Sequence, residues 1–290
     1  MAKHAYLILA HAEPELLRTL VALLDDPRND IYIHFDAKVK QLPELQTQAA
    51  GLTILSDRVS ISWADISMLE AEYKLFKTAR DSGNSYSYYH LLSGVDLPIK
   101  SQDYIHSFFD EHQGKEFVGI YQKYDSTLDR RVRYRHLFPK HFRKEEKMSG
   151  LFRRILRYAW LELQSRLKLQ RSKDITFYKG AQWISITERF LDYVLDRETE
   201  TLKRYQATFA PDEFFIQTLI VNSPFKEQLY DATDETRGCM RYIGWTEEGD
   251  LPEFTREQLP ELQQTECLFA RKFSSKDPAF IAEISKLARP

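Results

Sequence analysis

The chain has 290 residues, of which 43% are hydrophobic and 13% aromatic, so it can bury a substantial core in one large domain or two small ones. Its formal net charge of −2 argues against nucleic acid as the main partner. The two cysteines offer no disulfide framework, no run reaches the roughly 18 apolar residues of a membrane span, and the first residues do not resemble a secretion signal, so we expect a cytoplasmic protein.

Strand and helix patterns alternate through the first hundred residues. Short apolar runs predict buried strands, and apolar residues at helical spacing predict amphipathic helices. The predicted strands cover residues 5–10, 30–36, 52–56 and 85–94, and the predicted helices cover 13–26 and 66–81. This order is typical of an α/β fold, in which helices cover a mainly parallel sheet.

Polar residues stand at the ends of three of these predicted strands. His11 follows the first strand, Asp36 closes the second, and Ser93 and Asp96 come at the end of the fourth. Ligands of parallel sheets bind at the carboxyl ends of the strands, so these side chains are expected to border a binding crevice.

The second half of the chain has less regular patterns. Strands are predicted over 116–122, 177–186 and 240–245, one helix over 187–196, and another helix from Pro211. No internal repeat, low-complexity tract or linker composition divides the chain. We therefore expect one domain over residues 1–290.

A basic amphipathic helix is predicted over about residues 150–170. Segment 140–173 contains eleven Lys or Arg and three Glu, a local charge of +8. The predicted basic face holds Arg153, Arg154, Arg157 and Arg166, and the predicted apolar face holds Phe152, Ile155, Leu156, Ala159, Leu163 and Leu167. The basic face is either the solvated side of a structural helix or a contact for an anionic membrane surface or an anionic acceptor.

Two adjacent carboxylates, Asp212 and Glu213, follow Pro211 and precede an apolar run. Proline suits the first position of a helix, and acidic residues in the first turn interact favourably with the helix dipole. This pattern fits an ordinary helix start, and it also fits a site in which one carboxylate faces a ligand. The segment alone favours the helix start.

Missing motifs exclude several classes of site. The sequence contains no Walker or dinucleotide-binding glycine loop, no Gly-x-Ser-x-Gly elbow and no pair of histidines at metal-ligand spacing. It also lacks Asp-x-Asp, the carboxylate pair with which metal-dependent nucleotide-sugar enzymes usually hold a divalent ion.

Six stretches, in a fixed order, resemble one known family. They are YLILAHAEPELLRTLVALLDDPRNDIYIHFDAK at 6–38, SWADISMLEAE at 62–72, YYHLLSGVDLPIKS at 88–101, FYKGAQWISITERFLDYVL at 177–195, FAPDEFFIQTLI at 209–220 and LFARKF at 268–273. Together they are similar to the core-2/I-branching glycosyltransferase family, which also includes protein xylosyltransferases. The resemblance implies a single GT-A-type nucleotide-sugar-binding domain, with a UDP-binding half over about residues 1–120 and an acceptor-binding and catalytic half over about 121–290.

The resemblance also implies roles for single residues. The family's catalytic base is the Glu of its Pro-Asp-Glu segment, which is Glu213 here. One carboxylate suffices in an inverting transfer, because a single base removes the proton of the acceptor hydroxyl as that oxygen attacks the sugar. Arg241 and Lys272 are the counterparts of the family's basic pair, which offsets the charge of the departing UDP, so no metal and no other cofactor is expected.

The nucleotide is expected near Leu9, His11 and Asp36. Asp36 either accepts a hydrogen bond from the uracil or only closes the turn after its strand. Trp63 and Trp183 are the aromatic residues expected to stack on sugar rings, with Asp96 also at the substrate site. The alternative is that both tryptophans belong to the core, as large aromatic residues often do.

The functional prediction is an inverting, metal-independent transferase that moves N-acetylglucosamine from a UDP-sugar to a hydroxyl of a glycan or lipid-linked acceptor. UDP-xylose or another UDP-sugar is the alternative donor, and a non-catalytic sugar-nucleotide or glycan-binding module is the alternative of another class. Segment 121–143 aligns poorly with the family, so acceptor and linkage are not transferable. Animal members are luminal, membrane-anchored and cysteine-rich, so we expect a bacterial-type, cytoplasmic member whose basic helix is the point of contact if it docks on the inner membrane face.

Overall fold

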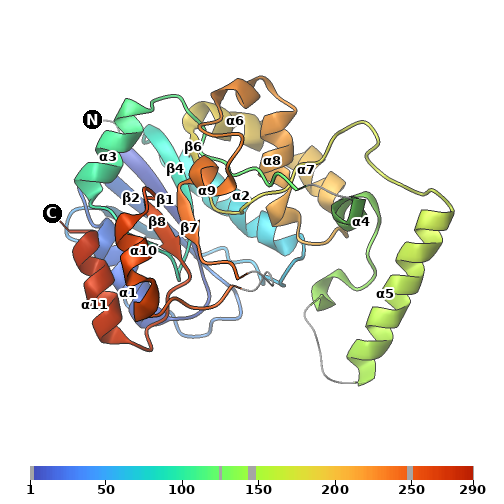
Figure 1. Cartoon of the computed structure of the whole chain (residues 1–290), viewed down its shortest axis with the longest axis horizontal. Helices are drawn as coiled ribbons and strands as arrows, with labels where there is room; N and C mark the ends of the chain where they lie inside the picture. The colour runs from blue at the N-terminus through green and yellow to red at the C-terminus, as the bar shows by residue number, and fades with distance from the viewer. Residues whose placement is uncertain (1–2, 124–125, 143–147, 247–250, 290) are drawn as a thin grey trace.

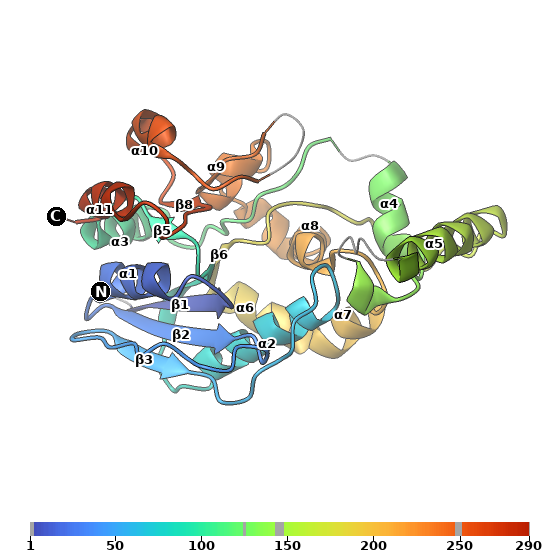
Figure 2. The ribbon, with the colours of Figure 1, turned by 90° about the horizontal axis from the view of Figure 1, so that it is seen from below.

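The computed structural model describes residues 3–123, 126–142, 148–246 and 251–289, and its centre is a five-stranded sheet (Figures 1 and 2). The strand order is β3-β2-β1-β4-β6. The strands are β1 (Lys3–Ala10), β2 (Asn29–Phe35), β3 (Gly51–Ile54), β4 (Tyr86–Ser93) and β6 (Ser185–Thr187). The first four are parallel, and β6 pairs antiparallel with β4. The predicted α/β fold with a mainly parallel sheet is confirmed.

Helices cover both faces of this sheet, as Figure 2 shows. One face is covered by α1 (Pro14–Leu24) and α3 (Gln102–Glu111), and the other by α2 (Ser67–Arg80) and α6 (Glu188–Asp196). Helix α11 (Pro278–Leu287) belongs to the same hydrophobic core as α1 and lies outside it (Figure 2). Alternate residues of β1 enter the two cores, because Tyr6 and Ile8 pack on the α1 side and Leu7 and Leu9 on the α2 side. Burial on both faces explains why the strands read as continuous apolar runs.

A second, smaller sheet has the order β5-β8-β7. Its strands are β5 (Leu97–Pro98), β7 (Arg241–Ile243) and β8 (Phe269–Arg271). Met240, Phe269 and Ala270 belong to the same hydrophobic core as α1, so this sheet packs on the α1 side of the large one. The strand predicted over 240–245 is present as β7.

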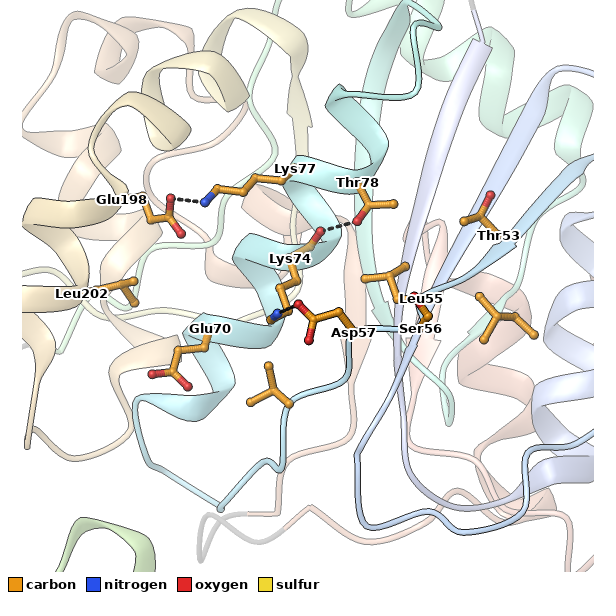
Figure 3. A pocket seen from close by; sticks show the side chains of 12 residues that line it. Thr53, Leu55, Ser56, Asp57, Glu70, Lys74, Lys77, Thr78, Glu198 and Leu202 are labelled. Carbon is orange, nitrogen blue, oxygen red and sulfur yellow. Dashed lines mark hydrogen bonds and ion pairs between the residues drawn. The ribbon is translucent and has the colours of Figure 1, made fainter.

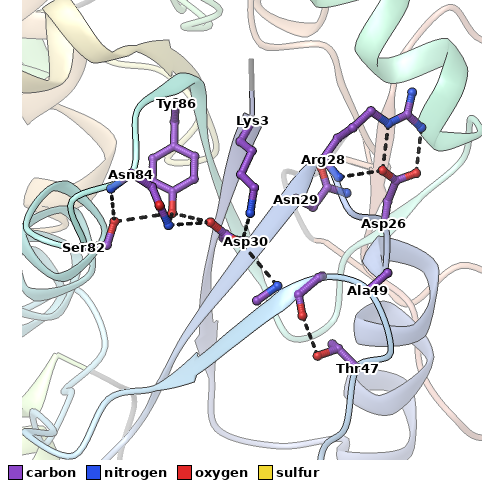
Figure 4. Close-up of polar contacts among 12 residues, drawn as sticks. Lys3, Asp26, Arg28, Asn29, Asp30, Thr47, Ala49, Ser82, Asn84 and Tyr86 are labelled. Carbon is purple, nitrogen blue, oxygen red and sulfur yellow. Dashed lines mark hydrogen bonds and ion pairs between the residues drawn. The ribbon is translucent and has the colours of Figure 1, made fainter. Parts of the chain in front are cut away.

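One buried carboxylate joins the amino ends of four strands (Figure 4). Asp30 of β2 accepts hydrogen bonds from the Gly51 amide of β3 at 3.2 Å and from the Tyr86 hydroxyl of β4 at 2.6 Å. It also pairs with the Lys3 ammonium of β1 at 3.0 Å and accepts a hydrogen bond from the Asn84 side chain. A buried charge is tolerated only when it is paired and hydrogen-bonded. Asp30 therefore aligns the starts of the parallel strands, and their carboxyl ends meet at the opposite edge.

Helices and short helical turns make up most of the second half. The α-helices are α4 (Ser126–Arg133), α5 (Met148–Arg166), α7 (Glu198–Tyr205), α8 (Phe215–Val221), α9 (Glu235–Cys239) and α10 (Leu259–Gln264). The 3₁₀ turns are η1 (Pro139–His141), η2 (Pro211–Glu213), η3 (Pro224–Gln228) and η4 (Arg256–Gln258). The helix predicted from Pro211 begins as η2 and continues as α8, and the helix predicted over 187–196 is α6.

Two strand predictions in this half are wrong over most of their length. Within 177–186 only the last residues belong to a strand, and the β-pairing of 116–122 in the described chain is limited to isolated bridges at Glu116 and Phe117. The two segments nevertheless run together, and the Tyr121 amide donates a hydrogen bond to the Lys179 carbonyl at 2.7 Å. Most of their apolar residues are buried, but no regular ladder forms.

Glycines allow these segments to approach at backbone distance. A Cβ atom on Gly180 would lie 1.9 Å from the carbonyl oxygen of Gly119, and a Cβ on Gly119 would lie 2.5 Å from the carbonyl oxygen of Glu235. A Cβ on Gly238 would lie 2.6 Å from the carbonyl oxygen of Asp231. Each obstructing atom belongs to the backbone, so a flexible side chain could not move aside, and only glycine fits.

The variant Gly180→Ala should lower the free energy of unfolding by about 3 kcal/mol, because its methyl group would overlap the Gly119 carbonyl. Urea denaturation followed by circular dichroism measures this change. Gly94→Ala is the matched control: the nearest atom to its new Cβ is a side-chain carbon of Ala10 at 3.4 Å, so a change within about 1 kcal/mol is expected. Equal stability of the two variants would contradict the close crossing.

Candidate functional site

The carboxyl ends of β1 and β2 bring together the residues predicted to bind a nucleotide. The Asp36 amide donates to the Ala10 carbonyl at 2.9 Å, Leu9 is buried at the end of β1, and His11 is exposed just after it. The buried Asp36 carboxylate accepts a hydrogen bond from the Lys38 amide at 2.9 Å and pairs with the Lys38 ammonium at 3.1 Å. These contacts fit the turn-closing interpretation of Asp36, and nucleotide binding at this edge stays a prediction.

Asp96 is buried in the turn after β4. Its carboxylate accepts hydrogen bonds from the Ser93 amide at 2.9 Å and the Ser93 hydroxyl at 2.5 Å, and it pairs with the Arg271 guanidinium at 3.2 Å. Burial raises the pKa of Asp96 above its ordinary value, although the positive charge of Arg271 opposes this change. The Arg271 guanidinium lies 4.1 Å from the ring centroid of Trp183. Trp183 is only 6% exposed, which favours the core interpretation of this residue.

Glu213 lies at the end of η2 and faces two cations. The left-handed backbone of Ala210, with φ of 50°, turns the chain before η2, and the Glu213 carbonyl accepts a hydrogen bond from the Gly180 amide at 2.9 Å. The Glu213 carboxylate accepts a hydrogen bond from Arg131 at 3.2 Å and lies 3.5 Å from the Lys179 ammonium. Its side chain is 31% exposed. Glu213 is therefore held in place by charge and remains accessible to a ligand.

Asp212, the other member of the acidic pair, lies in a different environment. Its Oδ1 atom is enclosed and has no hydrogen-bond partner among the described residues. Burial and the negative charge of Glu213 raise the pKa of Asp212. Glu72 of α2 is fully buried and accepts a hydrogen bond from Gln182 at 2.6 Å, and burial together with the charge of Asp212 raises its pKa as well. Enclosure thus shifts the pKa values of both carboxyl groups upward.

An exposed aromatic side chain lies next to η2. Trp63 is 57% exposed and meets the Phe209 ring edge-on, with centroids 5.6 Å apart. The Arg131 guanidinium lies over the same Phe209 ring at 5.2 Å. The Ala210 amide donates to the Ala64 carbonyl at 2.9 Å, which connects the residue after Trp63 to the turn that carries the acidic pair. An exposed tryptophan suits sugar stacking, which stays a prediction here.

Arg241 lies in the interior between the two sheets and is 1% exposed. Its guanidinium donates hydrogen bonds to the carbonyls of Cys239 and Ile184, and it lies 4.8 Å from the centroid of the Phe269 ring. Burial lowers the pKa of Arg241 to about 10. This position does not fit the predicted role as a phosphate ligand, because the guanidinium is enclosed and two of its donors already serve backbone carbonyls.

Lys272, the other member of the predicted basic pair, follows β8 and is partly exposed. Its carbonyl accepts a hydrogen bond from the Phe254 amide at 2.8 Å. No carboxylate within the described ranges pairs with its ammonium group. Lys272 therefore remains the predicted phosphate ligand.

Sequence reasoning did not single out the two cations beside Glu213. Lys179 belongs to stretch 177–195, which resembles the family, and directly precedes Gly180. That resemblance could have indicated Lys179 as a site residue. Arg131 lies within segment 121–143, which aligns poorly with the family. Arg131 and Glu213 are 82 residues apart in sequence, and only the fold brings them together.

A pocket of about 620 Å³ opens away from these residues, between β3, α2 and α7 (Figure 3). It contains none of the predicted site residues. Two lysines line it, and each already has an acidic partner, since Lys74 pairs with Asp57 and Lys77 with Glu198. An anionic ligand would have to compete with these ion pairs, so we assign no function to this pocket.

The described residues contain no group of three or more His, Cys, Asp or Glu side chains that could hold a metal ion. Among the same residues, no helix combines the length and apolar character needed to cross a membrane. Cys239 and Cys267 are both buried and free.

A family model and several curated proteins match most of the chain. A family model described as Branch: Core-2/I-Branching enzyme matches residues 4–268. Over 282 residues the chain is 23% identical to xylosyltransferase oxt of Drosophila melanogaster, with 89% of this chain and 30% of the relative covered. It is 21% identical over 260 residues to the human beta-1,3-galactosyl-O-glycosyl-glycoprotein beta-1,6-N-acetylglucosaminyltransferase, with 85% and 56% covered. The chain thus spans from less than a third to just over half of the length of these curated relatives.

Among solved structures, the crystal structure of mouse xyloside xylosyltransferase 1 in its apo form matches with a TM-score of 0.34 and 9% sequence identity. The match covers 92% of this chain and 96% of that one. The fold described above rests on the strands and helices of this chain alone.

The variant Arg241→Met should lower the free energy of unfolding by about 3 kcal/mol, because two buried carbonyls lose their hydrogen-bond donors. Thermal and urea denaturation measure the loss. Arg237→Met is the matched control, since the Arg237 side chain is 58% exposed and its contact with the Asp231 carboxylate is as long as 3.6 Å. That control should change stability by less than about 0.5 kcal/mol. Unchanged stability of Arg241→Met would contradict its buried structural role.

Proposed function

This chain belongs to the Core-2/I-branching enzyme family, and we propose that it is an inverting glycosyltransferase with a UDP-sugar donor. The proposed acceptor is a hydroxyl group of a glycan or glycolipid. The observation that carries this proposal is the environment of Glu213, a partly exposed carboxylate held by two cations.

In the proposed reaction, Glu213 acts as the general base. Its carboxylate takes the proton of the acceptor hydroxyl while the hydroxyl oxygen forms a bond to the anomeric carbon of the donor sugar. The bond between that carbon and the diphosphate oxygen breaks in the same step, and its electron pair leaves with UDP. The attack comes from the face opposite the leaving group, so the anomeric configuration inverts. No acid is required, because the diphosphate is a stabilised leaving group.

Arg131 and Lys179 support this role by positioning the base. Catalysis by proton transfer depends on a carboxylate that is already within hydrogen-bond reach of the hydroxyl, and contacts at 3.2 Å and 3.5 Å restrict the Glu213 side chain. Asp212 suits the same role less well, because its Oδ1 atom is enclosed and has no hydrogen-bond partner among the described residues. We therefore assign the proton transfer to Glu213 alone.

Lys272 is the proposed contact for the diphosphate, and no metal ion is part of the proposal. Its partly exposed ammonium offers a compact positive charge for the phosphate oxygens. The lack of Asp-x-Asp in the sequence supports a site that works without a divalent ion. Arg241 is left out of the proposed site because its guanidinium is buried.

We place N-acetylglucosamine first among the donor sugars and xylose second. Relatives of both kinds match this chain, with 21% identity to the human N-acetylglucosaminyltransferase and 23% to the insect xylosyltransferase, so both donors are compatible with the similarities. A screen of hydrolysis and transfer across UDP-sugars decides between these donors. Wild-type protein that binds UDP but consumes none of the sugars would support the binding-module alternative.

The variant Glu213→Gln should lower the turnover of the UDP-sugar about 10³-fold, because glutamine keeps the shape of the side chain but cannot accept the proton. The affinity for UDP, measured by calorimetry, should stay within about twofold of the wild-type value. Glu227→Gln on η3 is the matched control, because Glu227 is exposed on another element. Wild-type turnover in Glu213→Gln would rule out Glu213 as the base.

The variant Lys272→Ala should raise the Kd for UDP about tenfold, because one charge-assisted phosphate contact is lost. The Kd of the wild type and the size of this effect should be the same with and without EDTA. Lys226→Ala on η3, an exposed lysine elsewhere, should bind UDP like the wild type. Loss of UDP binding by the wild type in EDTA would contradict the metal-independent site.

A further inference from the structure

Helix α5 stands at the periphery of the molecule, away from both sheets (Figures 1 and 2). Hydrogen bonds and an ion pair on one side of the helix hold it to the rest of the chain. The Arg135 amide donates to the Gln164 side chain at 3.1 Å, and the Gln164 side chain donates back to the Arg135 carbonyl at 2.9 Å. The Glu162 carboxylate also pairs with Arg130 at 3.3 Å. These contacts fix which side of α5 faces the body.

An arginine of the predicted basic face contributes to these contacts. The Arg157 guanidinium donates hydrogen bonds to the carbonyls of Leu137 at 3.0 Å, Phe138 at 3.3 Å and His141 at 3.0 Å. It also lies 4.6 Å from the ring centroid of Phe142. The side of α5 that faces the protein is therefore partly cationic. An amphipathic helix usually packs its apolar side on the core and exposes its charged side, so the arrangement here is the reverse.

The outer side of α5 is apolar and exposed. We call it the α5 outer face, and its side chains are between 47% and 67% exposed. It consists of Leu151, Phe152, Ile155, Tyr158 and Leu163. Leu167 and Leu169 extend it beyond the end of the helix, with exposures of 58% and 51%. An exposed apolar patch of this kind is typical of a surface that binds another protein or a membrane.

Exposed cationic side chains stand on α5 and just after it. Segment 140–173 has a charge of +8 in a chain whose total is −2. Arg154, Arg166 and Lys168 are exposed in this segment. Two copies that met through it would bring two such segments together, and their charges would repel. A surface with dense negative charge and an apolar interior matches both properties at once.

We propose that the α5 outer face docks on the surface of a lipid bilayer that contains anionic lipids. In this arrangement the helix lies parallel to the membrane plane, with Phe152, Ile155 and Tyr158 inserted at the boundary between headgroups and acyl chains. Arg154 and Lys168 contact lipid phosphates beside them. The proposal is independent of the proposed transferase activity, because it uses no residue of the proposed catalytic site.

Flotation of the full chain with vesicles tests the apolar part of the proposal. The protein should float with vesicles of phosphatidylcholine containing about 30 mol% phosphatidylglycerol, and binding to pure phosphatidylcholine should be at least about tenfold weaker. The triple variant Phe152→Ser, Ile155→Ser, Tyr158→Ser should lower binding to the anionic vesicles at least about tenfold. The control Leu42→Ser, Trp245→Ser, which changes exposed apolar residues elsewhere, should bind like the wild type. Circular dichroism verifies that each variant is folded.

A charge-reversal pair tests the electrostatic part. Arg154→Glu with Lys168→Glu should abolish flotation with anionic vesicles, and Lys203→Glu with Lys226→Glu, two exposed lysines on other elements, should leave it unchanged. Equal effects of the two pairs would overturn the proposal, as would binding that does not weaken at high salt. The wild type should be a monomer by light scattering. A dimer that the triple serine variant dissociates would also overturn it, because a second copy would then cover the face.

Discussion

The close crossing of two backbone segments at Gly119 and Gly180 is the constraint on which the proposed site depends. Where one glycine meets the other's carbonyl, no side chain separates the segments, so neither can shift without overlapping the other. The Gly180 amide binds the carbonyl of Glu213, and Lys179, one residue earlier, reaches the Glu213 carboxylate. The position of this carboxylate is thus set by main-chain packing. A group held in this way loses little conformational freedom when a ligand binds, which suits a general base.

The same packing gives two neighbouring carboxyl groups different properties. Burial raises the pKa values of both Asp212 and Glu72, and the negative charge of Asp212 adds to the shift at Glu72. Glu213 is turned toward Arg131 and Lys179 and keeps part of its surface open. Adjacent acidic residues at a helix start look alike in sequence, but here Glu213 is paired with two cations and partly exposed, whereas the Oδ1 atom of Asp212 is enclosed.

Position in the fold also separates the arginines into distinct roles. Arg241 binds backbone carbonyls between the two sheets, and Arg271 joins Asp96 to the ring of Trp183. A guanidinium has enough donors to satisfy several buried carbonyls or carboxylates at once, which explains its use at both places. On α5 the positive charge lies at the periphery, where it adjoins an apolar surface. An arginine in a sequence motif therefore predicts a positive charge, but the motif does not predict which group that arginine binds.

The amino-acid pattern by itself determined the α/β fold, because strands buried on both faces read as apolar runs, as in β1, and the helices α1 and α2 carry one apolar stripe each. It also located the acidic pair through Pro211. Only the tertiary structure showed how residues 116–122 and 177–186 cross, because two irregular segments that cross can be as rich in apolar residues as two paired strands. The tertiary structure also decided which cations contact Glu213, that Arg241 is buried, and which side of α5 is exposed. Periodicity records which residues avoid water locally, whereas the partner of a charge is set by segments far apart in the chain, such as Arg131, 82 residues before Glu213.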